Sequence, residues 1–267
     1  MLPPRTVGSH RSTSVRCVHG SELGWLAAAG FAGGFVNAIA GGGSLLVFPA
    51  LVATGLSSVV ANVTNSVALW PGYIGNLVGL GRPAGREARR ELTLVMISAV
   101  ATALGTAILL ATPAGAFTVV VPILVLLATG LIGFQPAIAR RIGTEQTLRP
   151  RALRVAVGIG SVYGGYFGGG LGVILLAALG LTTTAPLRDM NRLKSVLQFV
   201  VATVSLLAFV LFGDVEWLAV AAIAPAALLG GIAGGRAARV VSERALRVAV
   251  VVFGLAIGIW LAVRAYS

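Results

Sequence analysis

The stretch GFAGGFVNAIAGGGSLLVFPAL, residues 30–51, holds three consecutive glycines, Gly41–Gly43, inside a long apolar segment. That segment, 23–55, has 33 residues and would form a helix of about 50 Å, against ~30 Å for the hydrocarbon core of a membrane. Each glycine costs a helix interior about 1 kcal/mol relative to alanine. The segment is therefore predicted to be two half-helices joined at the glycines.

A second triplet, Gly168–Gly170, follows the glycine-rich stretch GIGSVYGGYF and interrupts the segment 155–181 in the same way. Glycines also serve as packing residues where membrane helices cross. Because the interruption occurs twice and at matching places, the sequence favours a break in each half of the chain.

Composition places the chain in a membrane. The 267 residues are 57% hydrophobic and only 10% charged, whereas soluble domains carry about 25% charged residues. We therefore expect an all-α integral membrane protein of two halves, each with a glycine-broken helical hairpin and three transmembrane helices. The apolar segments are 23–55, 61–80, 91–111, 116–139, 155–181, 192–212, 216–235 and 245–264.

The net charge of +12 is the second compositional signal. In a soluble protein it would suggest nucleic acid, but here the basic residues sit in short loops between apolar segments. There they orient the protein by the positive-inside rule and touch anionic lipid headgroups. The expected partners are membrane lipid and a small anionic substrate, without nucleic acid.

The two halves of the chain repeat each other downstream of the triplets. Asn62 recurs 129 positions later as Asn191, and Ser66 recurs as Ser195. Polar stripes inside apolar helices face a bundle interior or a water-filled cavity, since lipid offers them no partners. At about 100° per residue, the residues that share a face are Asn62, Asn65, Ser66, Tyr73 and Asn76 in the first half, and Asn191, Lys194, Ser195, Gln198 and Ser205 in the second.

Charges in equivalent loops differ between the halves. The loop 82–91 is basic whereas its counterpart 213–216 is acidic, and the uncharged loop 112–115 has an arginine-rich counterpart at 236–247. Because cytoplasmic loops are rich in arginine and lysine, equivalent loops are predicted on opposite sides of the membrane. This describes two repeats of inverted topology, an architecture common in secondary transporters.

The predicted domains are a disordered polar arm at 1–20, a first repeat at 21–139, a basic cytoplasmic linker at 140–154 and a second repeat at 155–265. The loop 182–192 also carries arginines and is expected on the cytoplasmic side, so the broken segment before it must return to the side from which it starts. The same logic places the N-terminus outside, although the arm carries three arginines.

Catalytic and metal-binding patterns are missing from the sequence. Every carboxylate lies near a segment end or in a loop, and there is no HExxH motif or Ser-His-Asp set. His10 and His19 both precede the first apolar segment, and Cys17 is the only cysteine. The sequence therefore predicts no enzyme, no cofactor and no metal site.

The remaining features favour anions. A break exposes the N-terminus of a half-helix, whose free N–H groups and positive dipole end attract negative groups. Lys194, the only lysine, either extends to water at the cytoplasmic interface or draws an anion toward the glycines. Tyr73, Tyr163 and Tyr166 are further hydroxyl donors. The predicted substrate-binding residues are Gly41, Gly42, Gly43, Ser44, Asn62, Asn65, Ser66, Gly168, Gly169, Gly170, Asn191, Lys194, Ser195 and Gln198.

These motifs resemble the sulfite exporter TauE/SafE family of membrane transporters. The resemblance covers about residues 21–264, and its carriers are Asn37 with Gly41–Gly43, the stretch Ala-Asn-Val-Thr-Asn-Ser at 61–66, and the second glycine signature at 164–172. It implies alternating-access transport of sulfite or organosulfur anions across the bacterial cytoplasmic membrane, coupled to the proton gradient.

Alternatives stay open at this point. Leu193 and Lys194 stand where the first copy has Thr64 and Asn65, so the second half need not bind the same group as the first. The substrate can be another small anion such as a carboxylate, and the protein can be a passive anion channel or a membrane scaffold. A scaffold needs no polar stripes at membrane depth, and this chain has two.

Overall fold

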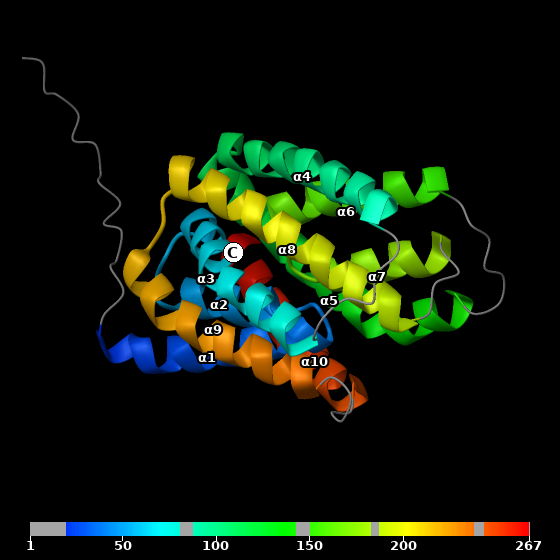
Figure 1. Cartoon of the computed structure of the whole chain (residues 1–267). Coiled ribbons are helices and arrows are strands. Elements are labelled where there is room, and N and C mark those ends of the chain that lie inside the picture. Colours follow the sequence, from blue (N-terminus) through cyan, green and yellow to red (C-terminus); the bar gives the residue numbers. More distant parts are fainter. Residues whose placement is uncertain (1–19, 81–87, 143–149, 183–186, 238–242, 267) are drawn as a thin grey trace, which may run out of the picture.

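The described part of the chain is almost entirely helical (Figure 1). The computed structural model describes residues 20–80, 88–142, 150–182, 187–237 and 243–266. No strand occurs in these ranges, which confirms the all-α prediction. After the short 3-10 helix η1 (Gly20–Glu22), the helices are α1 (Leu23–Ile39), α2 (Ser44–Ala53), α3 (Ser58–Leu80), α4 (Ala88–Ala111), α5 (Ala114–Ile142), α6 (Pro150–Tyr166), α7 (Leu171–Thr182), α8 (Leu187–Phe212), α9 (Trp217–Ala237) and α10 (Glu243–Tyr266).

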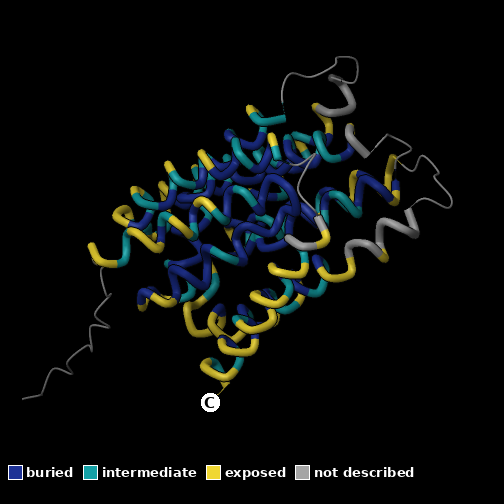
Figure 2. Tube along the Cα trace, turned by 90° about the horizontal axis from the view of Figure 1, so that it is seen from below, coloured by how far each residue is buried: buried dark blue, intermediate teal, exposed yellow. Residues whose placement is uncertain are grey.

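Membrane-spanning helices are present in both halves. Five helices of the described chain are long and apolar enough to cross a membrane, and α2 and α7 are shorter apolar helices. Large hydrophobic side chains are exposed on the outer helices (Figure 2), as at every fourth residue of α4 from Leu92 to Ile108. Water does not tolerate an apolar exterior of this extent, so it is the lipid-facing surface of a multi-pass membrane protein.

Both glycine triplets interrupt helices, as predicted. The break between α1 and α2 spans residues 40–43, and the break between α6 and α7 spans 167–170. After the second break the chain turns back on itself, because Gly160 of α6 lies against Ile174 of α7 and Gly164 lies against Leu171. The broken segment is therefore a helical hairpin.

Most packed pairs of helices recur when each helix of one half is replaced by its counterpart in the other half; the packing of α3 on α5 is an exception. In Figure 1, α1 runs along α9, and its counterpart α6 runs along α4. Individual contacts also match. A side chain on Gly234 would meet the carbonyl oxygen of Phe35, and one on Gly105 would meet that of Val162.

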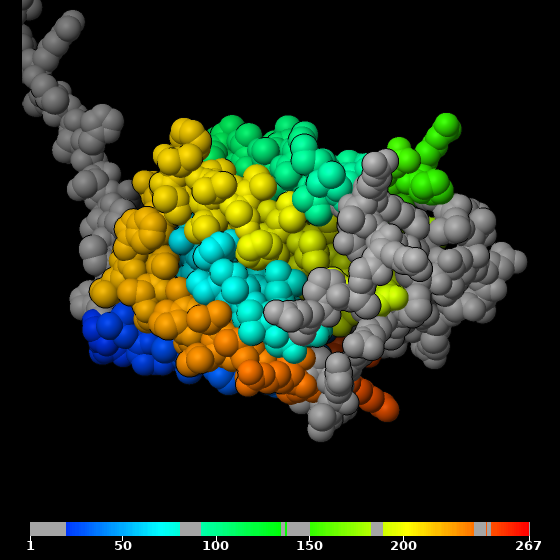
Figure 3. Space-filling view, in the orientation of Figure 1, coloured from blue at the N-terminus to red at the C-terminus, as the bar shows by residue number. Residues whose placement is uncertain are grey.

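At the centre, α3 and its counterpart α8 pack in antiparallel directions. The indole N–H of Trp70 donates to Thr203 Oγ1 at 3.0 Å, and Asn76 Nδ2 donates to Ser195 Oγ at 3.1 Å. Trp70 also packs against Phe199, which lies 129 positions later and is the counterpart of Trp70 in the second half. Figure 3 shows α8, α3 and α9 side by side on one face.

Helix boundaries differ from the sequence expectation at two basic stretches. The linker expected at 140–154 is helical at both ends, because α5 continues to Ile142 and α6 starts at Pro150, a residue suited to the first helical turn. The expectation of a loop at 182–192 is wrong from Leu187 onward, because α8 begins there. Asp189 lies in the first turn of α8, where its negative charge complements the helix dipole. Most of the polar arm, residues 1–19, lies outside the described ranges, as do 81–87 and 238–242 of two compared loops.

Candidate functional site

The first break begins where α1 ends in a left-handed glycine. Gly41 has φ +77°, a conformation that residues with a Cβ rarely adopt. Its N–H donates to the carbonyl of Val36 at 3.2 Å and to that of Asn37 at 3.1 Å, which closes the last turn of α1. Ser44 then starts α2.

The second break repeats this geometry. Gly168 has φ +76°, and its N–H donates to the carbonyl of Tyr163 at 3.3 Å. Gly168 and Tyr163 are each 127 positions after Gly41 and Val36, so the two breaks use equivalent hydrogen bonds. The Tyr163 hydroxyl donates to the carbonyl of Gly169 at 2.7 Å and holds the second break in place.

The two breaks touch. A Cβ on Gly41 would lie 2.5 Å from the Cα of Gly172, and a Cβ on Gly172 would lie 2.6 Å from the Cα of Gly41. Real Cβ atoms do not approach other atoms so closely, so both positions need glycine. The first break therefore lies against the start of α7, directly after the second break.

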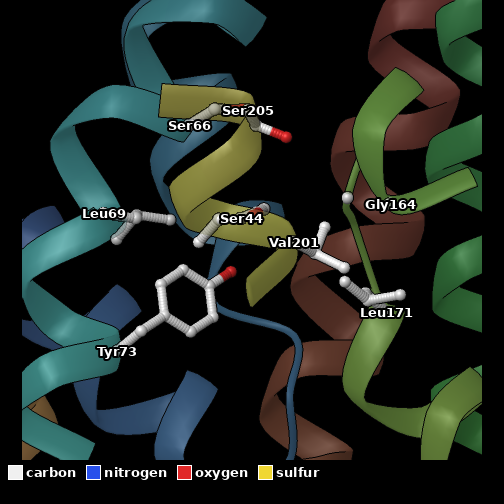
Figure 4. Close-up of a pocket in the computed structure, with 10 residues that line it drawn as sticks. Ser44, Ser66, Leu69, Tyr73, Gly164, Leu171, Val201 and Ser205 are labelled. Atoms are coloured by element: carbon white, nitrogen blue, oxygen red, sulfur yellow. The ribbon is translucent and has the colours of Figure 1, made fainter. Parts of the chain in front are cut away.

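A small cavity lies where the breaks meet α3 and α8 (Figure 4). The volume open to the centre of a water molecule is about 20 Å³, roughly enough for one water. In Figure 4 the ring of Tyr73 reaches into the cavity toward Ser44. The lining residues are Ser44, Ser66, Leu69, Tyr73, Gly164, Gly168, Leu171, Val201, Ala202 and Ser205.

The lining offers neutral donors and two helix N-termini. Ser44 is the first residue of α2 and Leu171 is the first residue of α7, so both half-helices begin at the cavity. Several of their first N–H groups donate to carbonyls of the breaks: that of Leu45 bonds Gly42 at 3.0 Å, and that of Leu171 bonds Gly168 at 3.3 Å. The positive end of each helix dipole still lies at the cavity. None of the ten lining residues is charged. The arrangement suits a small anion held by hydroxyl groups and by the two helix dipoles.

The predicted site residues divide between the cavity and its surroundings. Three of them line it, namely Ser44, Ser66 and Gly168. The other glycines shape the breaks: Gly42 faces Ile132 of α5, Gly43 faces the carbonyl of Gly33, and Gly170 faces Ala128.

The asparagines of α3 flank the cavity without lining it. Asn62 Nδ2 donates to the carbonyl of Tyr166 at 3.0 Å, which ties α3 to the end of α6. The side-chain oxygens of Asn62, Asn65 and Asn76 are buried without a hydrogen-bond partner.

The predicted residues of α8 lie toward its N-terminal end, away from the cavity lining. Ser195 Oγ donates to the carbonyl of Asn191 at 3.0 Å, as Ser66 Oγ does to that of Asn62. Lys194 is only 1% exposed, so its side chain lies inside the bundle. The interpretation that Lys194 extends to water does not describe this conformation.

The prediction omitted two polar lining residues, Tyr73 and Ser205. The sequence places both residues on the polar stripes, and this pattern is the signal that could have identified them as lining residues. The apolar lining residues, such as Leu69 and Val201, carry no such signal. Among the described residues, no group of three histidine, cysteine, aspartate or glutamate side chains gathers to hold a metal ion.

Comparison with known proteins identifies the family. The family model of the sulfite exporter TauE/SafE matches residues 26–261. The chain is similar to probable membrane transporter protein ORF9 of Sinorhizobium sp., at 25% identity over 89% of this chain and 91% of the relative. It is also similar to a probable membrane transporter protein of Haemophilus influenzae, at 26% identity over 84% of this chain and 88% of the relative. No solved structure matches it. The chain therefore belongs to the sulfite exporter TauE/SafE family of membrane transporters.

Proposed function

We propose that this protein is a secondary carrier that moves sulfite or organosulfur anions across the bacterial cytoplasmic membrane. The observation that carries the proposal is the meeting of two half-helix N-termini at one uncharged, hydroxyl-lined cavity. An oxyanion there accepts hydrogen bonds from the hydroxyl groups of Ser44 and Tyr73 and is stabilised by both helix dipoles. The family supports sulfur oxyanions over carboxylates as the substrate class.

The size of the cavity supports a carrier rather than a channel. A volume of about 20 Å³ holds roughly one water molecule, and a sulfite ion with its four heavy atoms needs more room. Substrate therefore binds only after the surrounding helices move, which is the behaviour of alternating access and not of an open pore.

The proposal includes an inverted repeat, with halves at about 21–139 and 155–265. The antiparallel packing of α3 on α8 supports it, because a two-fold axis that relates two antiparallel helices runs perpendicular to both. For helices that cross a membrane, such an axis lies in the membrane plane. With Cys17→Ser as background, Arg86→Cys and Asp214→Cys should react with an impermeant thiol reagent from opposite sides; reaction from the same side contradicts the inverted repeat.

Proton coupling is part of the same proposal. Since no charged side chain lines the cavity, the proton travels with the substrate as its weak acid or passes through Lys194. In either case an imposed pH gradient drives uptake, and a protonophore abolishes it.

The test is uptake into proteoliposomes of purified protein with labelled sulfite, methanesulfonate, acetate and chloride. We expect saturable uptake of the sulfur anions and none in protein-free vesicles. Acetate uptake without sulfite uptake would overturn the substrate class. Uptake that rises linearly with concentration would favour the passive channel, and absence of any flux would contradict transport.

A further inference from the structure

The residues that line the cavity have counterparts in the other half of the chain, and some of these counterparts form a second cluster of side chains. The counterparts of Ser66 and Leu69, 129 positions later, are Ser195 and Gln198. The counterpart of Ser205 is Asn76. These three counterparts gather on the same faces of α3 and α8, one or more helical turns from the cavity.

The cluster of Asn76, Ser195 and Gln198 has the hydrogen-bond pattern of its image. Ser195 Oγ donates to the carbonyl of Asn191 as Ser66 Oγ donates to that of Asn62. Ser195 Oγ in turn accepts from Asn76 Nδ2 at 3.1 Å. The cluster also reaches the breaks, because a side chain on Gly172 would meet the Gln198 amide nitrogen at 3.0 Å.

The side chains of the cluster are buried. Asn76 is 2% exposed, and Ser195 and Gln198 are each 1% exposed. Tyr73, whose side chain is hydrogen-bonded to Asn37, lines the cavity together with its counterpart Ala202.

The buried cluster holds polar atoms without partners. Neither the nitrogen nor the oxygen of the Gln198 amide makes a hydrogen bond, and the Asn76 side-chain oxygen makes none. The orientation of Asn76 is fixed, since its nitrogen donates to a hydroxyl that has already given its proton to Asn191. Proteins satisfy nearly all buried polar groups, so unpartnered atoms of this kind mark places where a ligand completes the hydrogen bonds.

We propose that Asn76, Ser195 and Gln198 form a second binding position for the transported anion, occupied when the two halves exchange conformations. The inference rests on the proposed carrier function. The Gln198 nitrogen donates to an oxygen of the anion, and Lys194, one helical turn before Gln198, adds positive charge from the same face. The free oxygens of Asn76 and Gln198 accept a hydrogen bond, so the position suits a singly protonated oxyanion such as hydrogensulfite.

The proposed two-fold relation between the halves exchanges the two positions, so each one serves a different face of the membrane. A variant of the cluster therefore weakens substrate binding from one face only, and a variant of the cavity weakens it from the other. A side chain that merely fills space has no such sidedness, because loss of packing affects both directions of transport alike.

The experiment uses proteoliposomes with one orientation of the full chain and measures KM for labelled sulfite from each face. Gln198→Met removes the amide at similar size, and Ser205→Ala is the matched variant on the cavity side. We expect Gln198→Met to raise KM about tenfold from one face, and Ser205→Ala to raise it from the opposite face. Ser161→Ala, whose hydroxyl bonds Ser98 between α4 and α6, is the control with unchanged KM.

The outcomes separate the two proposals. If the unmodified protein carries no sulfite, the proposed function itself fails. If it carries sulfite and Gln198→Met changes KM equally from both faces, changes neither, or folds without carrying flux, the second position is refuted and the carrier stands. If Gln198→Met is not recovered as a monodisperse protein, Gln198→Leu, which copies the counterpart Leu69, takes its place with the same criteria.

Discussion

The polar faces of α3 and α8 meet at two equivalent places with opposite results. Where Ser66 and Ser205 face the same space, a cavity remains. Where their counterparts Ser195 and Asn76 meet, the side chains bond to each other. The side chains at the two places do not match across the proposed repeat, which accounts for the difference.

Two mismatched pairs explain the asymmetry. Leu69 beside the cavity corresponds to Gln198 in the cluster, and Tyr73 corresponds to Ala202. An exact repeat would carry an aromatic ring at both positions, but only Tyr73 supplies one, because its counterpart is Ala202. The hydrogen bond with Asn37 holds the Tyr73 ring in one position. Under the proposed repeat, these unequal side chains leave a cavity at one of two related places and bond to each other at the second.

The largest effect is expected at the contact between the breaks. Gly41→Ala combines a strained left-handed backbone with a Cβ that meets the Cα of Gly172, and should destabilise the protein by about 3 kcal/mol or more and abolish transport. Gly168→Ala, which has the same φ but a nearest contact of 3.2 Å, should cost about 1–2 kcal/mol. Thermal unfolding in detergent measures both. Gly24→Ala is the neutral control. Equal losses of stability in Gly41→Ala and Gly168→Ala would show that the contact with Gly172 contributes nothing.

The next largest effect concerns the charge beside the cluster. Lys194→Met should weaken substrate binding by about 1.5–3 kcal/mol, the range for a charge-assisted hydrogen bond. Lys194→Arg should keep the attraction and disturb the fit, because the planar guanidinium is larger than an ammonium. Equilibrium binding of labelled sulfite to the purified variants measures this. Unchanged affinity in Lys194→Met would exclude the lysine from the binding region.

A smaller effect is expected from the hydroxyl that reaches into the cavity. Tyr73→Phe removes the hydroxyl that an anion would bond and also its hydrogen bond with Asn37, so it should raise the substrate KM about fivefold and lower stability by about 1 kcal/mol. Tyr163→Phe is the matched control, since its hydroxyl bonds the Gly169 carbonyl and lies outside the cavity lining. That variant should lower the unfolding temperature more than it changes KM, and the reverse pattern would contradict the assignment of Tyr73.

The smallest effect is expected at the acidic loop between α8 and α9. Asp214→Asn and Glu216→Gln should leave proton-coupled transport unchanged, because neither side chain lines the cavity. Glu216 has a structural role through its backbone N–H, which donates to Thr64 Oγ1 at 3.0 Å and which the substitution retains. Uptake of sulfite under an imposed pH gradient checks both variants, and loss of coupling in either would reveal a proton site in this loop.

Local patterns in the sequence predicted most of the fold. A glycine triplet interrupts a helix, so the breaks at Gly41 and Gly168 could be predicted from the length of each apolar segment and the low helix propensity of glycine. Helix starts within basic stretches were harder, because arginines near Pro150 resemble a loop by charge although proline suits the first turn.

The candidate site was predictable only in part. The stripes on α3 and α8 identified the right helix faces, since a polar side chain at membrane depth must face inward. Register between two helices decides which stripe residues meet, and this depends on packing over the whole interface. For that reason Ser195 and Gln198 could not be distinguished in advance from Ser66 and Ser44.

The central claim is that one site, formed where both breaks meet, carries an oxyanion by changing conformation. Counterflow tests it most directly: vesicles loaded with unlabelled sulfite are diluted into a trace of labelled sulfite. A carrier exchanges the two, so the label should rise above its equilibrium value and then decay. Label that only approaches equilibrium would show a passive pore or leak and would contradict the account.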